Sequence, residues 1–322
     1  MAENNTNSSS PSLAEVRTLN GAHSGRNPPK LTLCVPTWKD NCKELMRSLC
    51  NINSADQCAL VIYDDGSNDP ELTESIRQMI QHYPGPATLI TASQNRGRSW
   101  ARNRLMEEAH TQWLIFIDAD MRPDVSDYLD RYLKVIQTQQ DPALTVGGFS
   151  LKHAKLTPQT RLHAEQARLS ECLPASQRAK APGRYVFSSN ILVHRRILND
   201  IQFDPAFKGW GWEDVDWGLR IARAYPVQHI ENTATHLGLD TDSVLLRKYR
   251  KSAANFARTL MKNQRDLKQT SLYRMVKLLT PLPGKSLLQD LTEFIARAKF
   301  LPIRLRVFGL KLYRAAVYAE YV

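Results

Sequence analysis

The chain has 322 residues, of which 42% are hydrophobic and 23% are charged, and its formal net charge is +11. This composition allows a full globular core and excludes a chain that is disordered throughout. No run of about 18 apolar residues occurs, so the sequence predicts no membrane-spanning helix. Residues 1–30 are rich in asparagine, serine, glycine and proline and contain no apolar stretch like that of a secretory signal. They are therefore predicted to be a flexible leader.

From residue 31 onward, apolar strands alternate with helical segments. The strands begin near residues 31, 58, 87 and 112, and the helices begin near residues 43, 70 and 99. This alternation predicts an α/β fold with a mostly parallel sheet covered on both faces, in which ligands bind beyond the carboxyl ends of the strands. Polar clusters fall at three of these ends, at residues 36–40, 64–69 and 118–120. We expect one site to collect all three.

Two of these carboxylates follow an unusually apolar strand. Leu114 to Ile117 have the pattern of a strand buried on both faces, and Asp118 and Asp120 come directly after it. Two carboxylates at a strand end can hold Mg²⁺ or Mn²⁺ bridged to phosphate oxygens, so a diphosphate is the expected guest. A solvated turn is the alternative interpretation of the triplet.

Residues 207–220, FKGWGWEDVDWGLR, contain three tryptophans, three glycines and three acids. Glycine weakens regular elements and tryptophan needs large packing partners, so this segment is predicted to be a structured loop that enters a helix. Glu213 and Asp214 would lie near the N-terminus of that helix, where the dipole favours an ionised carboxylate that can act as a base. Helix capping alone is the alternative.

The basic character of the chain belongs to its C-terminal part. Residues 243–322 contain 17 lysines and arginines against four acids, a net charge of +13, so the rest of the chain carries −2. Segments 271–279, 285–300 and 302–322 alternate bulky apolar and basic residues at helical spacing. We expect a catalytic domain at 31–240 and a basic amphipathic helical region at 241–322 that lies on an anionic membrane surface. The alternatives are a helical bundle packed against the catalytic domain, or an oligomer contact.

The five cysteines are odd in number, and their spacing matches no zinc pattern. Reduced, mostly buried thiols in a cytosol are therefore expected. Together with the basic region, this predicts a cytoplasmic protein that is peripheral on the cytoplasmic face of a membrane.

Five motifs in order carry a resemblance to a known family: VPTW, VIYDDGSND, NRGRSWARN, FIDADMRPD and GWGWEDVDWGLRI. Across residues 31–239 the chain resembles a family 2 glycosyltransferase of the GT-A fold. The resemblance implies Mn²⁺- or Mg²⁺-dependent transfer of a sugar from a nucleotide diphosphate donor, usually UDP-linked, to a hydroxyl with inversion. The membrane spans and the Gln-x-x-Arg-Trp stretch of processive synthases do not occur here. We therefore expect one residue or a short alternation to be added to a lipid-linked or polysaccharide acceptor, as in polysaccharide biosynthesis.

The resemblance places the nucleotide against the first, second, third and fourth motifs. The uracil-binding carboxylate falls on Asp64 or its neighbour Asp65, and a carboxylate at a strand end can accept the imide N–H of uracil. The full set of expected nucleotide-binding residues is Pro36, Thr37, Asp64, Asp65, Asn95, Arg98 and Asp118. The neighbouring arginines Arg102 and Arg104 could also cradle phosphates or could be solvated helix charges.

The resemblance also assigns the metal and the base. Asp118 and Asp120 match the metal aspartates, with Asp120 expected as the direct ligand. His236 is a candidate third ligand, because some relatives complete the site with a histidine in a comparable place and imidazole suits Mn²⁺. The catalytic acids are Asp214, expected to be the base, and its neighbour Glu213.

Three residues are candidates for contacts with donor or acceptor sugar. Trp210 and Trp212 could offer flat apolar faces to a sugar or could pack beneath the loop, and Asn190 could contact a sugar or serve ordinary turn chemistry. Two other functions are alternatives to sugar transfer. One is an Asp-x-Asp phosphotransferase or phosphatase, although that motif normally follows the first strand of its fold. The other is a nucleic-acid-binding protein, although the bulky aliphatic side chains of the basic region fit a bilayer surface better and no nucleic-acid partner is expected.

Overall fold

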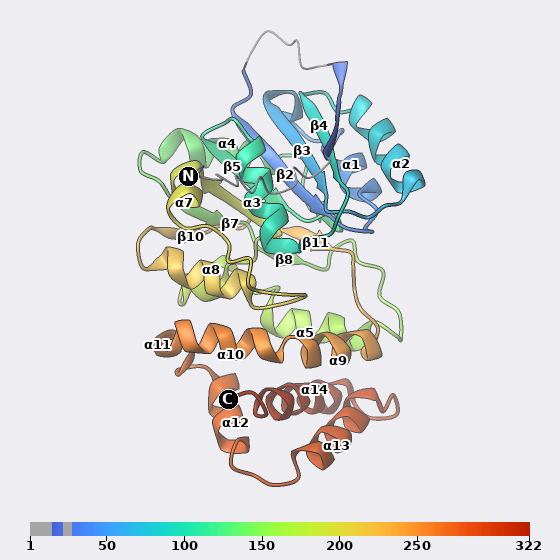
Figure 1. Cartoon of the computed structure of the whole chain (residues 1–322), viewed down its shortest axis with the longest axis vertical. Coiled ribbons are helices and arrows are strands. Elements are labelled where there is room, and N and C mark those ends of the chain that lie inside the picture. The colour runs from blue at the N-terminus through green and yellow to red at the C-terminus, as the bar shows by residue number, and fades with distance from the viewer. Residues whose placement is uncertain (1–14, 22–27) are drawn as a thin grey trace, which may run out of the picture.

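A computed structural model describes residues 15–21 and 28–322. Its central sheet has eight strands in the order β1-β4-β3-β2-β5-β9-β7-β10 (Figure 1). Strands β4, β3, β2 and β5 run parallel, whereas β9 runs antiparallel to β5 and to β7. The strand bounds are β1 Glu15–Leu19, β2 Leu31–Thr37, β3 Cys58–Asp64, β4 Ala87–Ala92, β5 Trp113–Ile117, β7 Leu144–Val146, β9 Asn190–His194 and β10 Val227–His229. The predicted α/β fold with a mostly parallel sheet is confirmed.

Part of the predicted leader belongs to this sheet. Strand β1 pairs antiparallel with the edge strand β4. The buried side-chain amide of Asn20 then donates hydrogen bonds to the carbonyls of Ile80, Tyr83 and Gly85 at 3.1, 3.2 and 2.9 Å. The prediction of a flexible leader is therefore wrong for residues 15–20. Its remaining parts, residues 1–14 and 22–27, lie outside the described residues.

Helices cover both faces of the sheet because the central strands are apolar on both faces. In β2, Leu31, Leu33 and Val35 enter one core, while Cys34 enters the core on the opposite face. Helices α1 Lys43–Leu49, α2 Pro70–Gln81 and α4 Tyr128–Thr138 pack in the first core. Helices α3 Arg98–Glu108, α7 Arg195–Asp200 and α8 Glu213–Ala222 pack in the second. Each predicted helix in this part of the chain is present, and the 207–220 segment enters α8 at Glu213 as expected.

A second, three-stranded sheet lies beyond the end of β5. It has the order β6-β11-β8, with bounds β6 Met121–Pro123, β11 Ala234–His236 and β8 Phe149–Ser150. Strand β11 runs antiparallel to β6, and their register pairs His236 with Met121. This pairing brings His236, which is distant in sequence, beside the Asp118–Asp120 turn.

The C-terminal helices pack on the underside of the catalytic part (Figure 1). A third core joins side chains of α5, α8, α9, α10, α12, α13 and α14, among them Leu162, Leu219, Phe256 and Tyr318. The helix bounds are α5 Arg161–Ser170, α6 Ala175–Arg178, α9 Asp242–Lys251, α10 Ala253–Lys262, α11 Gln264–Leu267, α12 Ser271–Leu279, α13 Lys285–Arg297 and α14 Ile303–Tyr318. The bundle alternative for this region therefore describes its packing, since most of its apolar faces are buried within the protein.

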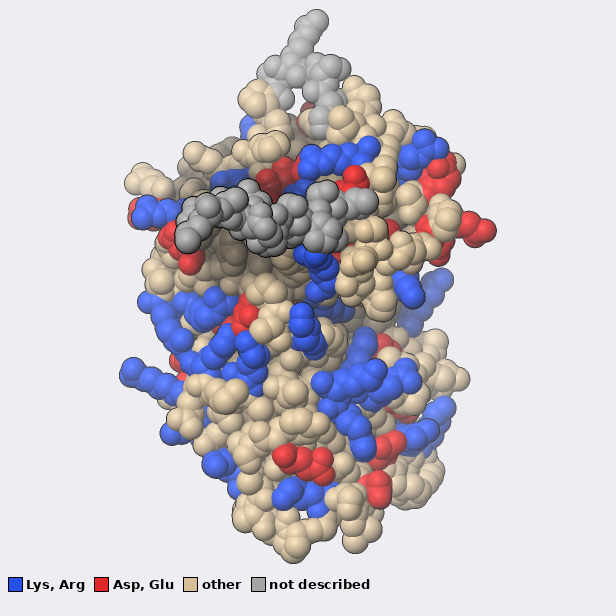
Figure 2. Space-filling view, in the orientation of Figure 1, with Lys and Arg blue, Asp and Glu red and all other residues tan. Residues whose placement is uncertain are grey.

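One apolar face of this bundle remains exposed. Leu287, Leu291 and Phe294 follow one another at helical spacing on α13 and are 74%, 55% and 60% exposed. Phe300 is 78% exposed, and its ring centroid lies 6.5 Å from that of Phe294. We call these four residues the outer stripe. Uncharged surface predominates at the tip formed by the C-terminal helices, in the lower part of Figure 2. Across the described ranges, 15–21 and 28–322, none of the helices has both the length and the apolar character needed to cross a bilayer.

Candidate active site

The carboxyl ends of β2, β3 and β5 meet at one edge of the sheet, as predicted. The register pairs Pro36 with Tyr63 and Thr37 with Asp64. Thr37 is buried, its hydroxyl donates to the carbonyl of Asp40 at 3.0 Å, and its own carbonyl accepts the N–H of Asp65 at 2.9 Å. The turns that follow β2 and β3 are thus fixed to each other at the edge of the site.

The two acids at the end of β3 differ in their partners. Asp64 accepts the backbone N–H and the hydroxyl of Ser67, both through Oδ1. Asp65 uses both carboxylate oxygens to accept the backbone N–H groups of Arg96 and Gly97 at 2.7 to 3.1 Å. Burial raises the pKa of each carboxyl, and these hydrogen bonds oppose the increase. Both carboxylate oxygens of Asp65 therefore bind the turn that begins α3, whereas Asp64 forms its two bonds to Ser67 through a single oxygen.

Helix α3 directs a cation into the site. The side chain of Asn95 donates to the carbonyl of Asp65 at 3.0 Å, and Arg98 is the first residue of the helix. Arg98 is about half exposed, and its Nη1 lies 3.8 Å from Oε1 of Glu213 at the start of α8. Its charge also favours the ionised form of Asp120, lowering the pKa of that carboxyl. Arg98 thus lies between acids contributed by β5 and by α8.

Asp118 is held by a buried arginine. Nη2 of Arg102 donates to Oδ1 of Asp118 at 2.9 Å, and the arginine side chain is only 2% exposed. Burial raises the pKa of Asp118, and the charges of Arg102 and Arg98 oppose the increase. The alternative of a solvated Arg102 is therefore wrong. Its position four residues after Arg98 on one helix face is the sequence signal that could have indicated a shared role.

Asp120 and His236, two of the three residues expected to bind the metal, lie side by side. Oδ2 of Asp120 lies 3.1 Å from Nε2 of His236. Burial alone would raise the pKa of Asp120, but the hydrogen bond to His236 and the nearby positive charges outweigh it and lower the pKa. Burial alone would likewise lower the pKa of His236, but the hydrogen bond to Asp120 and the charge of that carboxylate outweigh burial and raise the pKa. Behind the imidazole, the rings of Phe149 and His163 have centroids 6.2 and 5.9 Å from it.

The acids of α8 have different surroundings. Asp214 accepts the backbone N–H of Ser188 at 3.1 Å and the Ser188 hydroxyl at 2.6 Å. Glu213 is 5% exposed, and its Oε2 has no hydrogen-bond partner among the described residues. Burial and then the charge of Asp214 raise the pKa of Glu213. Ser188, which orients Asp214, was not singled out from the sequence because its partner is 26 residues away.

The two tryptophans before these acids are partly buried. Trp210 packs against Tyr249 with ring centroids 5.8 Å apart, and Nζ of Lys248 lies 5.7 Å from the Trp210 ring. Trp212 donates its indole N–H to the hydroxyl of Tyr318 at 3.0 Å. Packing beneath the loop, one of the two alternatives for these residues, is thus observed for Trp212.

Asn190 lies in the interior and is 0% exposed. Its side-chain oxygen accepts the hydroxyls of Tyr128 and Tyr132, and its amide donates to the carbonyls of Gly148 and Asn232. All four hydrogen-bonding positions of the amide are used within the fold. The backbone of Asn190 pairs with Ile117, the residue before Asp118, but its side chain is bonded within the fold and anchors the start of β9.

A cavity of about 480 Å³ opens beside the site, between the first turn of α3 and the loop before α8. Its lining residues are Asn95, Arg96, Gly97, Trp100, Pro205, Phe207, Lys208 and Gly209. The volume falls within the range of ordinary small-molecule sites. The carboxylates described above do not line this cavity, which therefore adjoins the acidic cluster without containing it.

Comparison with known proteins identifies the family of the chain and similar folds. The family model described as "Glycosyl transferase family 2" matches residues 32–200. No curated protein is similar enough to the sequence to count as a match. The mannosyltransferase PcManGT from Pyrobaculum calidifontis, solved with GDP-Man and Mn²⁺, superimposes with a TM-score of 0.60 at 16% identity, covering 92% of this chain and 87% of that one. S. aureus TarS 1–349 has a TM-score of 0.49 at 17% identity, covering 88% and 91% of the two chains.

Proposed function

Because the chain belongs to glycosyl transferase family 2, we propose that this glycosyltransferase moves a hexosyl or N-acetylhexosaminyl group from a UDP-sugar to a hydroxyl of a lipid-linked or polysaccharide acceptor, with inversion. The observation that carries the proposal is the position of Arg98, 3.8 Å from Glu213 and electrostatically coupled to Asp118 and Asp120. An arginine among acids at the strand ends is suited to a diphosphate that is accompanied by a divalent cation.

The nucleotide would lie along the ends of β2 and β3. Asp64 is the better candidate for the base contact, because both oxygens of Asp65 already bind the α3 turn. Pro36 and Thr37 would border the uridine, and Arg98 would approach the diphosphate from the side of α3. In this arrangement Arg102 acts indirectly, by holding Asp118 at 2.9 Å.

The metal ion that the family implies is compatible with the side chains present. Asp120 and His236 offer a carboxylate and an imidazole 3.1 Å apart, a donor pair that suits Mn²⁺. In the part of the chain that the structure describes, no three His, Cys, Asp or Glu side chains gather closely enough to hold an ion. Diphosphate oxygens would therefore complete the coordination. When bound, the ion would offset the negative charge that develops on the departing diphosphate.

Asp214 is proposed to be the base. It stands at the start of α8, and Ser188 fixes the direction of its carboxylate through two hydrogen bonds. A carboxylate oriented in this way can take the proton from the acceptor hydroxyl as that oxygen attacks the anomeric carbon. The bond to the diphosphate breaks on the opposite face of the sugar, which produces inversion.

A panel of donors tests the proposal directly. The full chain is incubated with Mn²⁺ and UDP-glucose, UDP-galactose, UDP-GlcNAc or GDP-mannose, and the release of nucleoside diphosphate is measured. GDP-mannose is included because the similar mannosyltransferase was solved with it. We expect slow hydrolysis of at least one UDP-sugar and none after chelation of the metal with EDTA. Hydrolysis of GDP-mannose alone would contradict the UDP assignment, and release of free phosphate would favour the phosphotransferase alternative.

The place of action is proposed to be an anionic membrane surface on the cytoplasmic side. The outer stripe presents four large apolar side chains to solvent, and helices α12 to α14 with their connections, residues 271–322, carry nine lysines and arginines against three acids. Apolar side chains accompanied by cations match an interface of acyl chains and anionic headgroups. A membrane-bound enzyme would meet a lipid-linked acceptor without crossing the bilayer.

Replacing Leu287, Leu291 and Phe294 together with glutamine should release the protein from vesicles of phosphatidylcholine and phosphatidylserine. Burying each such side chain is worth roughly 1.5 kcal/mol or more, so co-sedimentation should fall more than tenfold. The matched control replaces Leu156 and Leu169, which are 47% and 51% exposed elsewhere on the molecule. Equal binding by the triple variant and the control would contradict membrane docking through this face. Dimerisation of the wild-type protein through the outer stripe, without binding to the vesicles, would also contradict membrane docking.

A further inference from the structure

The backbone just before the proposed base has an unusual conformation. Trp212 precedes Glu213 and Asp214 and has a φ of +77°, in the left-handed region that favours glycine. Gly209 and Gly211, with φ of +72° and +93°, share that region without a steric penalty. A tryptophan there costs of order 1 kcal/mol and persists only where its surroundings impose the conformation. The question is which part of the molecule imposes it.

The last helix supplies the main contact. The hydroxyl of Tyr318, a fully buried side chain of α14, accepts the indole N–H of Trp212 at 3.0 Å. The same hydroxyl lies 2.6 Å from the hydroxyl of Ser252 and accepts Nε of Arg314 at 3.2 Å. Phe256 packs against both rings, 4.9 Å from Trp212 and 4.7 Å from Tyr318 by centroid, and the centroids of Trp212 and Tyr318 are themselves 6.1 Å apart. The indole is therefore held at its edge and on its face.

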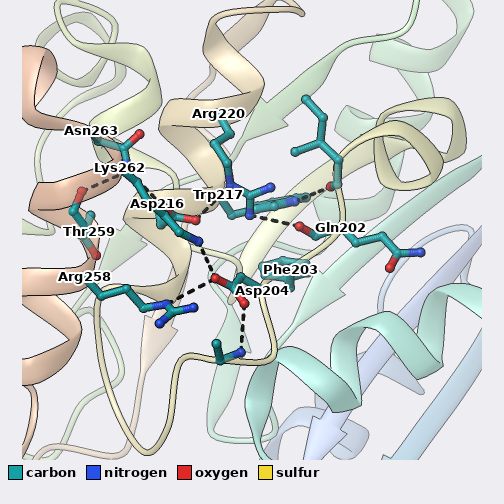
Figure 3. Close-up of polar contacts among 12 residues, drawn as sticks. Gln202, Phe203, Asp204, Asp216, Trp217, Arg220, Arg258, Thr259, Lys262 and Asn263 are labelled. Carbon is teal, nitrogen blue, oxygen red and sulfur yellow. Dashed lines mark hydrogen bonds and ion pairs between the residues drawn. The ribbon is translucent and has the colours of Figure 1, made fainter.

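Helix α10 holds the rest of the loop. The side chain of Asn255 donates to the carbonyls of Lys208 and Gly211 at 2.9 and 3.0 Å. At the start of the loop, Asp204 bonds to Arg258 and Lys262, as Figure 3 shows.

The first turn of α8 has its own anchor at the residue that follows α10, Asn263. Oδ1 of the buried Asp216 accepts Nδ2 of Asn263 at 2.8 Å, and Oδ2 accepts Nε of Arg220 (Figure 3). The loop from residue 203 to residue 212 is thus fixed at both ends by the C-terminal helices. Within the described chain, the only side-chain hydrogen bond between this loop and α14 joins Trp212 to Tyr318.

We propose that Tyr318 is a positioning residue for catalysis: its hydroxyl holds the Trp212 indole, and through it the left-handed backbone that aims Asp214 at the acceptor hydroxyl. This inference rests on the proposed role of Asp214 as the base. It assigns the last helix a part in the chemistry, although Tyr318 lies 104 residues after Asp214 in the chain. Loss of the hydroxyl leaves the ring stack intact and frees the indole to shift. Misplacement of a reacting group by about 1 Å can cost a hundredfold in rate.

The test compares two identical substitutions on the same helix. Tyr318→Phe removes the hydroxyl that holds Trp212, whereas Tyr313→Phe removes the hydroxyl of another buried tyrosine of α14, which accepts Nε of Arg250 at 3.0 Å. In Tyr318→Phe we expect kcat for nucleotide-sugar hydrolysis to fall roughly tenfold or more with KM changed less than about twofold. Hydrogen exchange of residues 209–216 should accelerate. In Tyr313→Phe both quantities should stay near wild type.

Trp212→Phe removes the same hydrogen bond from the other side and serves as the second variant. The double variant should lose no more turnover than the more impaired single variant, because both changes act through one contact. Unchanged exchange at residues 209–216 in Tyr318→Phe would overturn the inference, as would equal loss of turnover in Tyr313→Phe. Fully additive losses in the double variant would overturn it too. If the wild-type chain turns over no nucleotide-sugar, the proposed function fails, whereas the exchange comparison still decides whether Tyr318 holds the loop.

Discussion

Replacing Asp214 with asparagine is expected to lower turnover by about a hundredfold or more, the usual scale for loss of a general base, while nucleoside diphosphate binding stays unchanged. Asparagine has nearly the same shape and can remain beside Ser188, but its amide cannot accept the proton of the acceptor hydroxyl. The measurements are kcat with the donor that the panel identifies and the affinity for UDP by titration calorimetry.

Two variants serve as controls for this result. Asp127→Asn changes an aspartate in an exposed ion pair with Arg131, where little free energy is at stake, and should leave both quantities unchanged. Glu213→Gln separates the two acids of α8. Burial raises the pKa of Glu213, and none of the described residues donates a hydrogen bond to its Oε2, whereas Ser188 orients both oxygens of Asp214. If Asp214→Asn loses donor affinity but keeps its turnover, Asp214 is not the base.

Asp120→Ala is expected to abolish transfer and to remove the Mn²⁺-dependent part of nucleoside diphosphate binding. In the proposed site this carboxylate and His236 hold the ion, so the diphosphate would lose the cation that neutralises it. The measurement is the affinity for UDP with Mn²⁺ and with EDTA, in both the wild-type protein and the variant.

The fold should survive this change. The side chain of Asp120 is 35% exposed at a strand end and lies outside the apolar core, so its removal leaves no cavity in that core. A urea midpoint close to that of the wild type would verify that the lost affinity is local. Unchanged transfer by a folded Asp120→Ala protein would disprove the metal assignment.

The central sheet could be predicted because its signals are local. The apolar run from Leu114 to Ile117 ends where β5 ends, and the segment predicted at residues 271–279 coincides with α12. In both places the side-chain pattern and the burial agree. Strand β1 could not be predicted in the same way. Its residues EVRTL have a weak apolar pattern, and the strand depends on pairing with β4 and on the bonds of Asn20, which are contacts with residues 60 or more positions away.

The candidate site likewise contains some residues that could be predicted from the sequence and others that could not. The acids at the ends of β3 and β5 were predicted because strand ends can be read from the sequence, and the structure brings them to one edge. The roles of Ser188 and Tyr318 could not be predicted. A serine or a buried tyrosine carries no signal in the sequence until the fold places its partner beside it. Asn190 illustrates the converse: a polar residue at a strand start looks available in the sequence, yet the surrounding tyrosines and carbonyls use its whole amide.

The third core has a bearing on how such an enzyme can be shortened or recombined. Leu162 and Leu219 precede residue 240, yet they share a core with Phe256 and Tyr318. A cut at residue 240 would leave apolar side chains on both pieces facing water. A chimera that took its C-terminal helices from another transferase would bring foreign side chains against the loop that precedes α8. Exchange of this region would therefore disturb the packing beneath that loop, and residue 240 is no neutral crossover point.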